Sequence, residues 1–180
     1  MIQKKDKSIL VFRFSALGDI AMTIPVLRSF FNTYPNQKIT FVSRGFVEPL
    51  FKEFDNLEFV SVDFNNDFKG LKGLFKLFKL LRKNNIKGVA DLHNVLRTKI
   101  LKMFFRMVFI KVQSIDKGRA DRKRLTQKNN KKFKPLTPIH YRYCDVFGRL
   151  GFPIDLTNHE YPIKPFLPEN SEEQKILSKS

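Results

Sequence analysis

The stretch Ser8-Ile-Leu-Val-Phe-Arg-Phe14, followed by Ser15-Ala-Leu-Gly-Asp19, decides the fold class. Its first part is a short apolar run, which is typical of a buried strand. Its second part has the small and capping residues of a turn, and from Ile20 to Phe31 apolar residues return at helical spacing. A buried strand that turns directly into a helix is the opening unit of a parallel α/β sheet.

The rest of the sequence repeats this alternation. Further strands are predicted over residues 38–43, 57–62, 86–92 and 108–115, and further helices over residues 47–54, 68–83, 95–105 and 138–150. The last helix has Thr137 as its expected N-cap and stops at Gly151. We therefore predict a Rossmann-like parallel sheet with helices on both faces over residues 1–160. Residues 161–180 are expected to form an interdomain linker or the start of another domain.

The positive charge of the chain is concentrated in one region. The 180 residues include 34 Lys and Arg against 17 Asp and Glu, a net charge of +17. Residues 69–134 hold 21 of the basic residues and three acidic ones, so the whole excess lies there. Such a local field favours an anionic partner, which is nucleic acid, a phosphorylated substrate or an acidic membrane.

Two segments of this basic region have different expected structures. Residues 68–83 predict an amphipathic helix with lysines on its outer face. Residues 116–134 have almost no apolar side chains and predict an exposed, mobile loop. The side chains expected on the buried face of the helix are Leu71, Leu74, Phe75, Phe78 and Leu81.

Composition and motifs exclude several classes of protein. A single cysteine, Cys144, excludes a disulfide framework and fits a reducing compartment. The sequence has no Gly-x-Gly-x-x-Gly and no Gly-x-x-x-x-Gly-Lys-Ser/Thr, so the common nucleotide-binding fingerprints are absent. His140 and His159 have no ligand spacing with each other or with Cys144, and we expect neither a metal site nor a cofactor.

Asp19 is the most informative candidate residue. It follows the first predicted strand at its carboxyl end, where α/β sheets bind their ligands. A carboxylate at this place is able to accept a proton from a substrate hydroxyl. The alternative is that Asp19 only caps the helix and satisfies its first N–H groups. Spacing alone leaves both open.

Several blocks of this sequence resemble one known family. The segment from Ile9 to Arg28, with its Ser-x-x-Gly-Asp turn and the Thr-x-Pro after it, resembles the N-terminus of the heptosyltransferases of lipopolysaccharide synthesis, glycosyltransferase family 9. Tyr34-Pro-Asn and Lys38-Ile-Thr-Phe41 continue this first block, and the likeness covers nearly the whole chain. Weaker blocks are Asp91-Leu-His-Asn-Val-Leu-Arg97, Lys117-Gly-Arg119 and the segment from Tyr141 to Phe152.

The resemblance implies a division of labour between two domains. In this family two Rossmann-like domains face each other in the GT-B arrangement, and this chain is similar to the N-terminal, acceptor-binding half. The resemblance makes Asp19 the catalytic base of a metal-independent, inverting sugar transfer, with Ser15 and Gly18 shaping its turn. Arg13 matches a position that is commonly basic. The other expected acceptor-binding residues are His93, Arg97, Lys117 and Arg119.

The resemblance also implies the partners. The donor is expected to be ADP-heptose, and the acceptor an anionic lipid-linked saccharide such as a lipopolysaccharide core. The family's donor-domain signatures do not occur here, so we expect a truncated chain that lacks the donor site and is inactive alone. We further expect a cytoplasmic monomer, peripheral at the cytoplasmic face of the inner membrane and in contact with its anionic surface.

Two functions without catalysis stay open. A basic nucleic-acid-binding protein fits the charge, but the Phe residues fall at core positions instead of between basic residues, so no nucleic-acid partner is expected. A membrane-surface protein is compatible with the helix at 68–83. For single residues the alternative is structural: His93 as a hydrogen-bonding residue after a strand, and each basic side chain as part of a solvated surface.

Overall fold

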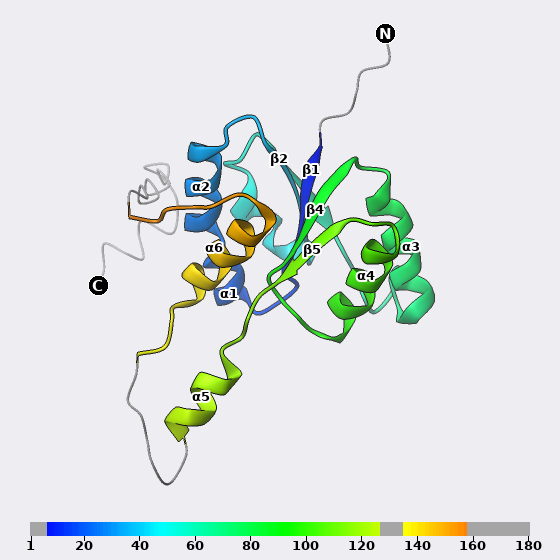
Figure 1. The fold of residues 1–180 in the computed structure, drawn as a ribbon. Helices are drawn as coiled ribbons and strands as arrows, with labels where there is room; N and C mark the ends of the chain where they lie inside the picture. Colours follow the sequence, from blue (N-terminus) through cyan, green and yellow to red (C-terminus); the bar gives the residue numbers. More distant parts are fainter. Residues whose placement is uncertain (1–6, 127–134, 158–180) are drawn as a thin grey trace, which may run out of the picture.

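One parallel β-sheet forms the centre of the fold, as the computed structural model in Figure 1 shows. The structure describes residues 7–126 and 135–157. Its strands are β1 (Ser8–Phe12), β2 (Lys38–Ser43), β3 (Leu57–Ser61), β4 (Ile86–Asp91) and β5 (Lys111–Ser114). They pair in the order β3-β2-β1-β4-β5, each parallel to its neighbours. The predicted Rossmann-like sheet is confirmed.

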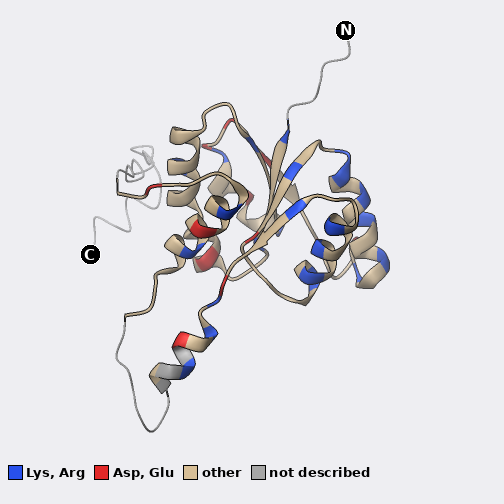
Figure 2. Cartoon of the chain, viewed as in Figure 1, with Lys and Arg blue, Asp and Glu red and all other residues tan. Residues whose placement is uncertain are grey.

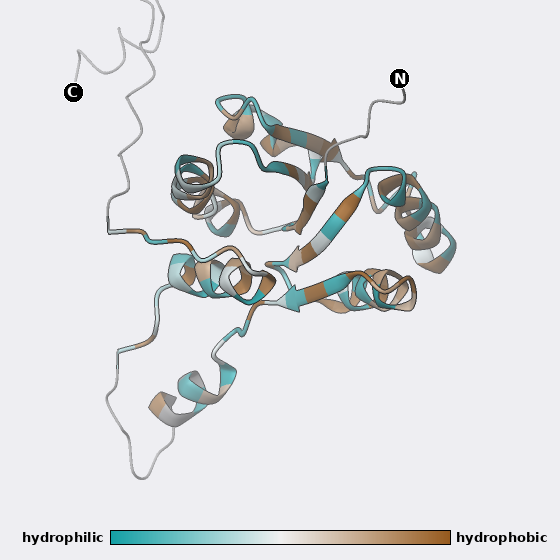
Figure 3. Cartoon of the chain, turned by 45° about the horizontal axis from the view of Figure 1, so that its top comes forward, coloured by the Kyte–Doolittle hydropathy of each residue, from teal (hydrophilic) through white to brown (hydrophobic). Residues whose placement is uncertain are grey.

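Helices cover both faces of this sheet, which the rotated view in Figure 3 makes clear. One face carries α1 (Leu17–Ala21), α2 (Ile24–Thr33), the 3-10 helix η1 (Gly45–Phe51) and α6 (Ile139–Leu150). The other carries α3 (Gly70–Arg82) and α4 (Leu96–Met107). A further helix, α5 (Arg119–Thr126), projects away from the sheet (Figure 1). The expected linker at 161–180 lies outside the described residues.

The central strand β1 divides the core into two layers. Because side chains alternate along a strand, Ile9 and Val11 pack on the side of α2 and α6, and Leu10 and Phe12 on the side of α3 and α4. All four are fully buried. A strand covered on both faces needs apolar residues at every position, which is why its sequence is a continuous apolar run.

The prediction of a single helix over residues 20–31 is wrong, because the structure has two helices in this region. The chain breaks at Thr23, whose hydroxyl donates a hydrogen bond to the carbonyl of Ile20 at 2.6 Å and competes with the helical pattern. Pro25 then lies in the first turn of α2, where its missing N–H costs nothing. The break leaves Asp19 on a short separate helix at the edge of the sheet.

The region after α4 also differs from expectation. The strand expected over residues 108–115 is shorter, because α4 continues to Met107 and Phe109 takes a left-handed conformation with φ of 60°. Helix α5 occupies part of the segment expected as a loop, since Arg, Lys, Ala and Leu all favour helix. Residues 127–134 of that segment lie outside the described residues.

Two of the apolar residues expected inside α3 are at the surface. Leu71 is 66% exposed and Phe75 is 44% exposed. Leu77 is fully buried in their stead, and Gly73 lies so close to the backbone of Phe68 that an added Cβ would come within 2.2 Å of it. This close contact fixes which side of α3 meets the sheet, and it turns Leu71 and Phe75 outward.

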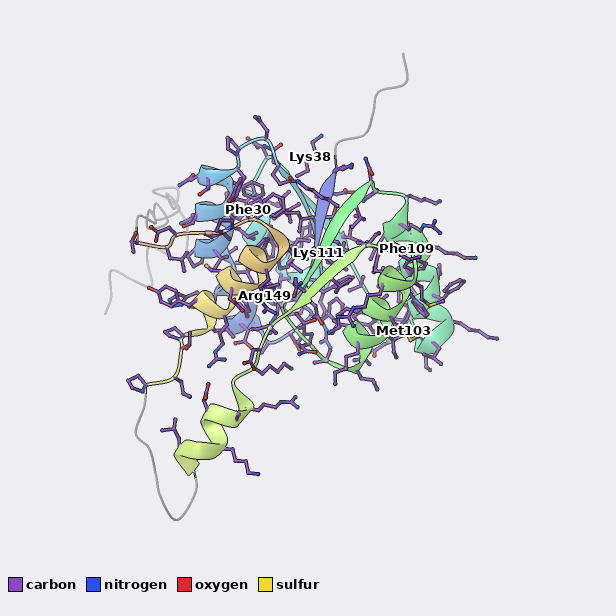
Figure 4. The ribbon with its side chains drawn as sticks, viewed as in Figure 1. Phe30, Lys38, Met103, Phe109, Lys111 and Arg149 are labelled. Carbon is purple, nitrogen blue, oxygen red and sulfur yellow. The ribbon has the colours of Figure 1, made fainter. Side chains whose placement is uncertain are left out.

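The predicted end of the last described helix is confirmed, and its predicted start is wrong by one residue. Helix α6 stops at Gly151, whose φ of 101° is left-handed and favours glycine. Its N-cap is Pro138 and not Thr137. Phe147 of α6 packs against Phe30 of α2, labelled in Figure 4, with ring centroids 5.1 Å apart.

Candidate functional site

A pocket of about 560 Å³ opens at the carboxyl edge of the sheet. In parallel α/β sheets this edge is where ligands bind. The turn between β1 and α1, the turn after β4, the segment after β5 and the start of α6 all contribute to its walls. The polar side chains that line it are Arg13, Ser15, Asp19, His93, Lys117, Thr137 and Arg142.

Arg13 and Asp19 form an ion pair at this pocket. The side chain of Arg13 is 6% exposed, and its Nη1 donates to the backbone oxygen of Leu92 at 2.7 Å. Its Nη2 donates to Oδ2 of Asp19. A buried guanidinium needs such partners, so the end of β4 fixes Arg13, and Arg13 in turn orients Asp19. The Asp19 side chain remains 46% exposed, which leaves it accessible to a ligand.

Tyr143 of α6 holds the backbone of the same residue. Its hydroxyl donates to the carbonyl oxygen of Asp19 at 3.1 Å, and its ring is fully buried. Burial raises the pKa of Tyr143 to about 12, so the phenol stays protonated as a donor at neutral pH. The sequence indicates Tyr143 as a buried helical residue, but no pattern in it signals a bond to the α1 backbone.

His93 follows β4 and lines the same pocket, next to Ser15. Its Nε2 is 3.3 Å from Oγ of Ser15, and its ring meets the ring of Phe14 edge-on at 5.6 Å. Burial, assisted by the positive charges of Arg13 and Lys117, lowers the pKa of His93 to about 4. The imidazole is therefore neutral at neutral pH, and it offers a ligand hydrogen bonds without charge. Its Nδ1 is buried without a hydrogen-bond partner among the described residues.

A buried polar network supports the turn that carries His93. Oδ1 of Asp91 accepts the backbone N–H groups of His93 at 3.1 Å and Asn94 at 2.7 Å. Nζ of Lys102 lies 2.9 Å from Oδ2 of Asp91, and it donates to Oγ of Ser114 at 2.7 Å and to Oδ1 of Asn94 at 3.2 Å. The network thus ties the ends of β4 and β5 to α4. The sequence does not predict that Lys102 is buried, because a lysine on an amphipathic helix ordinarily indicates a solvated face.

Two further basic side chains give the pocket an excess of positive charge. Lys117 and Arg142 line it together with Arg13 and the carboxylate of Asp19, and Arg142 also lies 3.9 Å from the carboxylate of Asp121 on α5. Arg142 donates to the backbone oxygens of Thr137 at 3.0 Å and Asp116 at 3.1 Å, so its position is fixed by the chain around it. An excess of guanidinium and ammonium groups suits phosphate or carboxylate oxygens.

The structure brings together five of the eight residues that the sequence singled out. Gly18 lies in α1 outside the pocket lining, and an added Cβ there would meet nothing within 4 Å. Arg97 packs over the ring of Phe64 at 5.1 Å and lines a separate cavity of about 320 Å³. Arg119 is exposed on α5. The five that line the pocket are Arg13, Ser15, Asp19, His93 and Lys117.

Within residues 7–126 and 135–157, no three His, Cys, Asp or Glu side chains are grouped in a way that suits a metal ion. None of the helices in these residues has the length and apolar character needed to cross a membrane.

Comparison with known proteins finds similarity at the level of structure. No protein-family model and no curated protein sequence matches the chain. A glycosyl transferase of family 9 from Veillonella parvula matches with a TM-score of 0.59 and 20% identity, over 96% of this chain and 48% of that one. The E. coli heptosyltransferase WaaC with ADP matches with a TM-score of 0.58 and 15% identity, over 86% and 51%. WaaC with ADP-2-deoxy-2-fluoro heptose gives 0.61 and 16%, over 90% and 55%.

These similarities confirm the predicted resemblance at the level of the fold. The chain spans about half the length of the structures that it matches. Its five-stranded sheet and covering helices are thus the fold found in one half of those glycosyltransferases.

Proposed function

We propose that this chain, over residues 1–160, is the acceptor-binding domain of a heptosyltransferase-like glycosyltransferase. The observation that carries the proposal is the Asp19 carboxylate, which a buried arginine orients at the edge of a cationic pocket. The fold shared with a family 9 glycosyl transferase and with WaaC supports the same assignment. The donor is a nucleotide sugar of the ADP-heptose type, bound by a second domain.

In the proposed reaction Asp19 acts as the base. Its carboxylate takes the proton of an acceptor hydroxyl while the hydroxyl oxygen attacks the anomeric carbon of the donor sugar. A carbon–oxygen bond forms to the acceptor, and the bond from the anomeric carbon to the diphosphate breaks on the opposite side. The electron pair leaves with the nucleoside diphosphate, and the anomeric configuration is inverted. Arg13 holds the carboxylate in place throughout.

The pocket fits an anionic saccharide as the acceptor. Its volume of about 560 Å³ is in the usual range for a small-molecule site. Lys117 and Arg142 supply charge for a phosphate or carboxylate on the sugar, and neutral His93 supplies a hydrogen bond to a hydroxyl. A lipid-linked, phosphorylated saccharide of the lipopolysaccharide-core type combines these groups, and it would place the enzyme at the cytoplasmic face of the inner membrane.

A chimera tests the catalytic assignment. The chain is joined to the donor-binding half of E. coli WaaC, and transfer of labelled heptose to a heptose-free core acceptor is measured. We expect Asp19→Asn to lower transfer by about 10²–10⁴-fold, because general-base catalysis contributes in this range. The matched control is Asp145→Asn, which removes an exposed carboxylate on α6 and leaves transfer unchanged. Near-normal transfer by the Asp19→Asn chimera would leave Asp19 with only a structural role as the ion-pair partner of Arg13.

A further inference from the structure

The outer face of α3 and α4 carries positive charge without exposed negative charge. Helices α3 and α4 hold seven exposed Lys and Arg and no Asp or Glu, and the only acidic residue in the chain between the two helices is Asp91. Asp91 is fully buried and is paired with Lys102, so it does not offset the charge outside. Figure 2 shows the two helices marked by basic residues only. This side of the molecule therefore attracts anions over a broad surface.

The same face exposes large apolar side chains. Phe75 of α3 packs against Phe104 of α4 with ring centroids 5.5 Å apart, so the apolar surface continues from one helix to the other. Soluble proteins rarely expose a contiguous apolar area of this kind without a partner for it. The large apolar residues exposed on the two helices, each between 44% and 73% exposed, are Leu71, Phe75, Leu80, Leu96, Met103 and Met107.

The turn after α4 adds the most exposed aromatic residue of the described chain. Phe109 is 98% exposed and has a left-handed backbone, which is unfavourable for a residue other than glycine. Its N–H donates to the carbonyl of Arg106 at 2.9 Å, so the turn is held in this form. Figure 4 marks Phe109 and Met103 on the same side of the molecule. The turn thus presents an aromatic ring to the surroundings, next to the exposed Met107.

We propose that the α3–α4 face, including the turn at Phe109, docks on a bilayer that contains anionic phospholipid. Basic side chains around an apolar strip fit the headgroup region, where lysines meet phosphates while apolar groups enter the acyl boundary. A second copy of the chain is a poor occupant, because two faces of equal positive charge repel each other. Nucleic acid matches the charge but gives no place to the aliphatic side chains of Leu71, Met103 and Met107.

This inference does not rest on the proposed sugar transfer. The pocket lies near the start of α4, which begins three residues after His93, whereas the turn at Phe109 lies at the other end of α4, toward the amino ends of the strands.

Vesicle binding by the 180-residue chain tests the proposal. Sedimentation is measured with phosphatidylcholine vesicles, with and without phosphatidylglycerol, and with a DNA oligonucleotide as competitor. We expect binding only to the anionic vesicles, and weaker binding at about 0.5 M salt than at about 0.1 M, because salt screens the attraction. The double variant Phe109→Ser/Met107→Ser should lose about tenfold or more in vesicle affinity, because each substitution removes a large apolar side chain that would enter the bilayer.

Matched controls separate this face from the rest of the surface. Phe46→Ser removes an exposed phenylalanine from η1, which lies on the other face of the sheet, and it should leave vesicle binding unchanged. Lys72→Glu/Lys99→Glu should weaken binding far more than Lys7→Glu/Lys52→Glu, which changes the net charge equally elsewhere. Circular dichroism verifies that each variant is folded.

Three results would overturn the proposal. The first is equal binding to neutral and anionic vesicles, and the second is an equal loss of vesicle affinity in the control variants. The third is displacement of the chain from anionic vesicles by DNA at physiological salt, together with unchanged vesicle affinity of the Phe109→Ser/Met107→Ser variant. None of these results bears on transfer by the chimera, so the two proposals fail separately.

Discussion

Replacing Lys102 by methionine should destabilise the fold strongly, although a lysine on an amphipathic helix is ordinarily dispensable. Lys102 is 7% exposed, and its ammonium group is the cation next to the fully buried Asp91. Methionine has a similar length, so Lys102→Met removes the charge and the hydrogen bonds without opening a large cavity. The variant therefore isolates the electrostatic role of the network beneath the His93 turn.

The magnitude follows from what Asp91 keeps. Removing one partner of a buried ion pair costs about 3–5 kcal/mol, because the other charge stays buried without compensation. Asp91 retains the N–H groups of His93 and Asn94, at 3.1 and 2.7 Å, which favours the lower end of that range. We expect a loss of about 3 kcal/mol in the free energy of unfolding, or about 1.5 M in the urea midpoint for a typical m-value of about 2 kcal/mol/M.

Urea unfolding followed by circular dichroism measures this loss. Lys99→Met, on the exposed side of the same helix, is the matched control and should change the free energy by less than about 0.5 kcal/mol. The double variant Asp91→Asn/Lys102→Met should recover part of the loss, because the residue left behind is then neutral. A loss below about 1 kcal/mol for Lys102→Met, with no recovery in the double variant, would mean that Lys102 does not compensate the buried charge of Asp91.

Two further predictions concern His93 and Gly151. Burial lowers the pKa of His93 from 6.5 to about 4. Between these two pH values the imidazole of the unfolded chain binds a proton and that of the folded chain does not. The free energy of unfolding therefore falls as the pH falls from 6.5 towards 4. Urea unfolding at pH 7 and pH 4.5 should show a smaller acid loss for His93→Gln than for the unchanged chain, and equal losses would contradict this role of burial. Gly151→Ala should cost about 1–2 kcal/mol, measured in the same way, because φ is 101° and nothing within 4 Å would clash with a Cβ, so the cost is that of the backbone alone. No measurable cost would mean that α6 ends in another conformation.

Much of the sheet follows from the sequence because its central strands are buried on both sides. Ile9 to Phe12 form a continuous apolar run, and Ile39, Phe41 and Val42 are fully buried in the neighbouring strand. The order of these strands along the chain, with helices between them, predicts a parallel sheet. The position of Asp19 at the carboxyl edge follows in the same way. These features depend on local pattern, which a single sequence displays.

The features that the sequence did not predict depend on contacts between distant segments. Arg142 lines the pocket and Tyr143 bonds to the backbone of Asp19 only because α6 packs against segments more than 100 residues away along the chain. The outward turn of Leu71 is set by the contact of Gly73 with Phe68, and spacing alone assigned it to the core. Lys102 is buried because Asp91 lies beneath it.

Acceptor binding by the isolated chain shows directly whether the pocket of Arg13, Asp19 and Lys117 holds an anionic saccharide. Calorimetric titration with a deacylated, phosphorylated, heptose-free core saccharide separates this pocket from any membrane contact, and ADP is titrated for comparison. We predict saturable saccharide binding that Lys117→Gln weakens about tenfold, as for the loss of one charge-assisted hydrogen bond, and that Lys52→Gln leaves unchanged. We also predict no binding of ADP at about 1 mM. Micromolar ADP binding without saccharide binding would contradict the account, because the pocket would then be a nucleotide site.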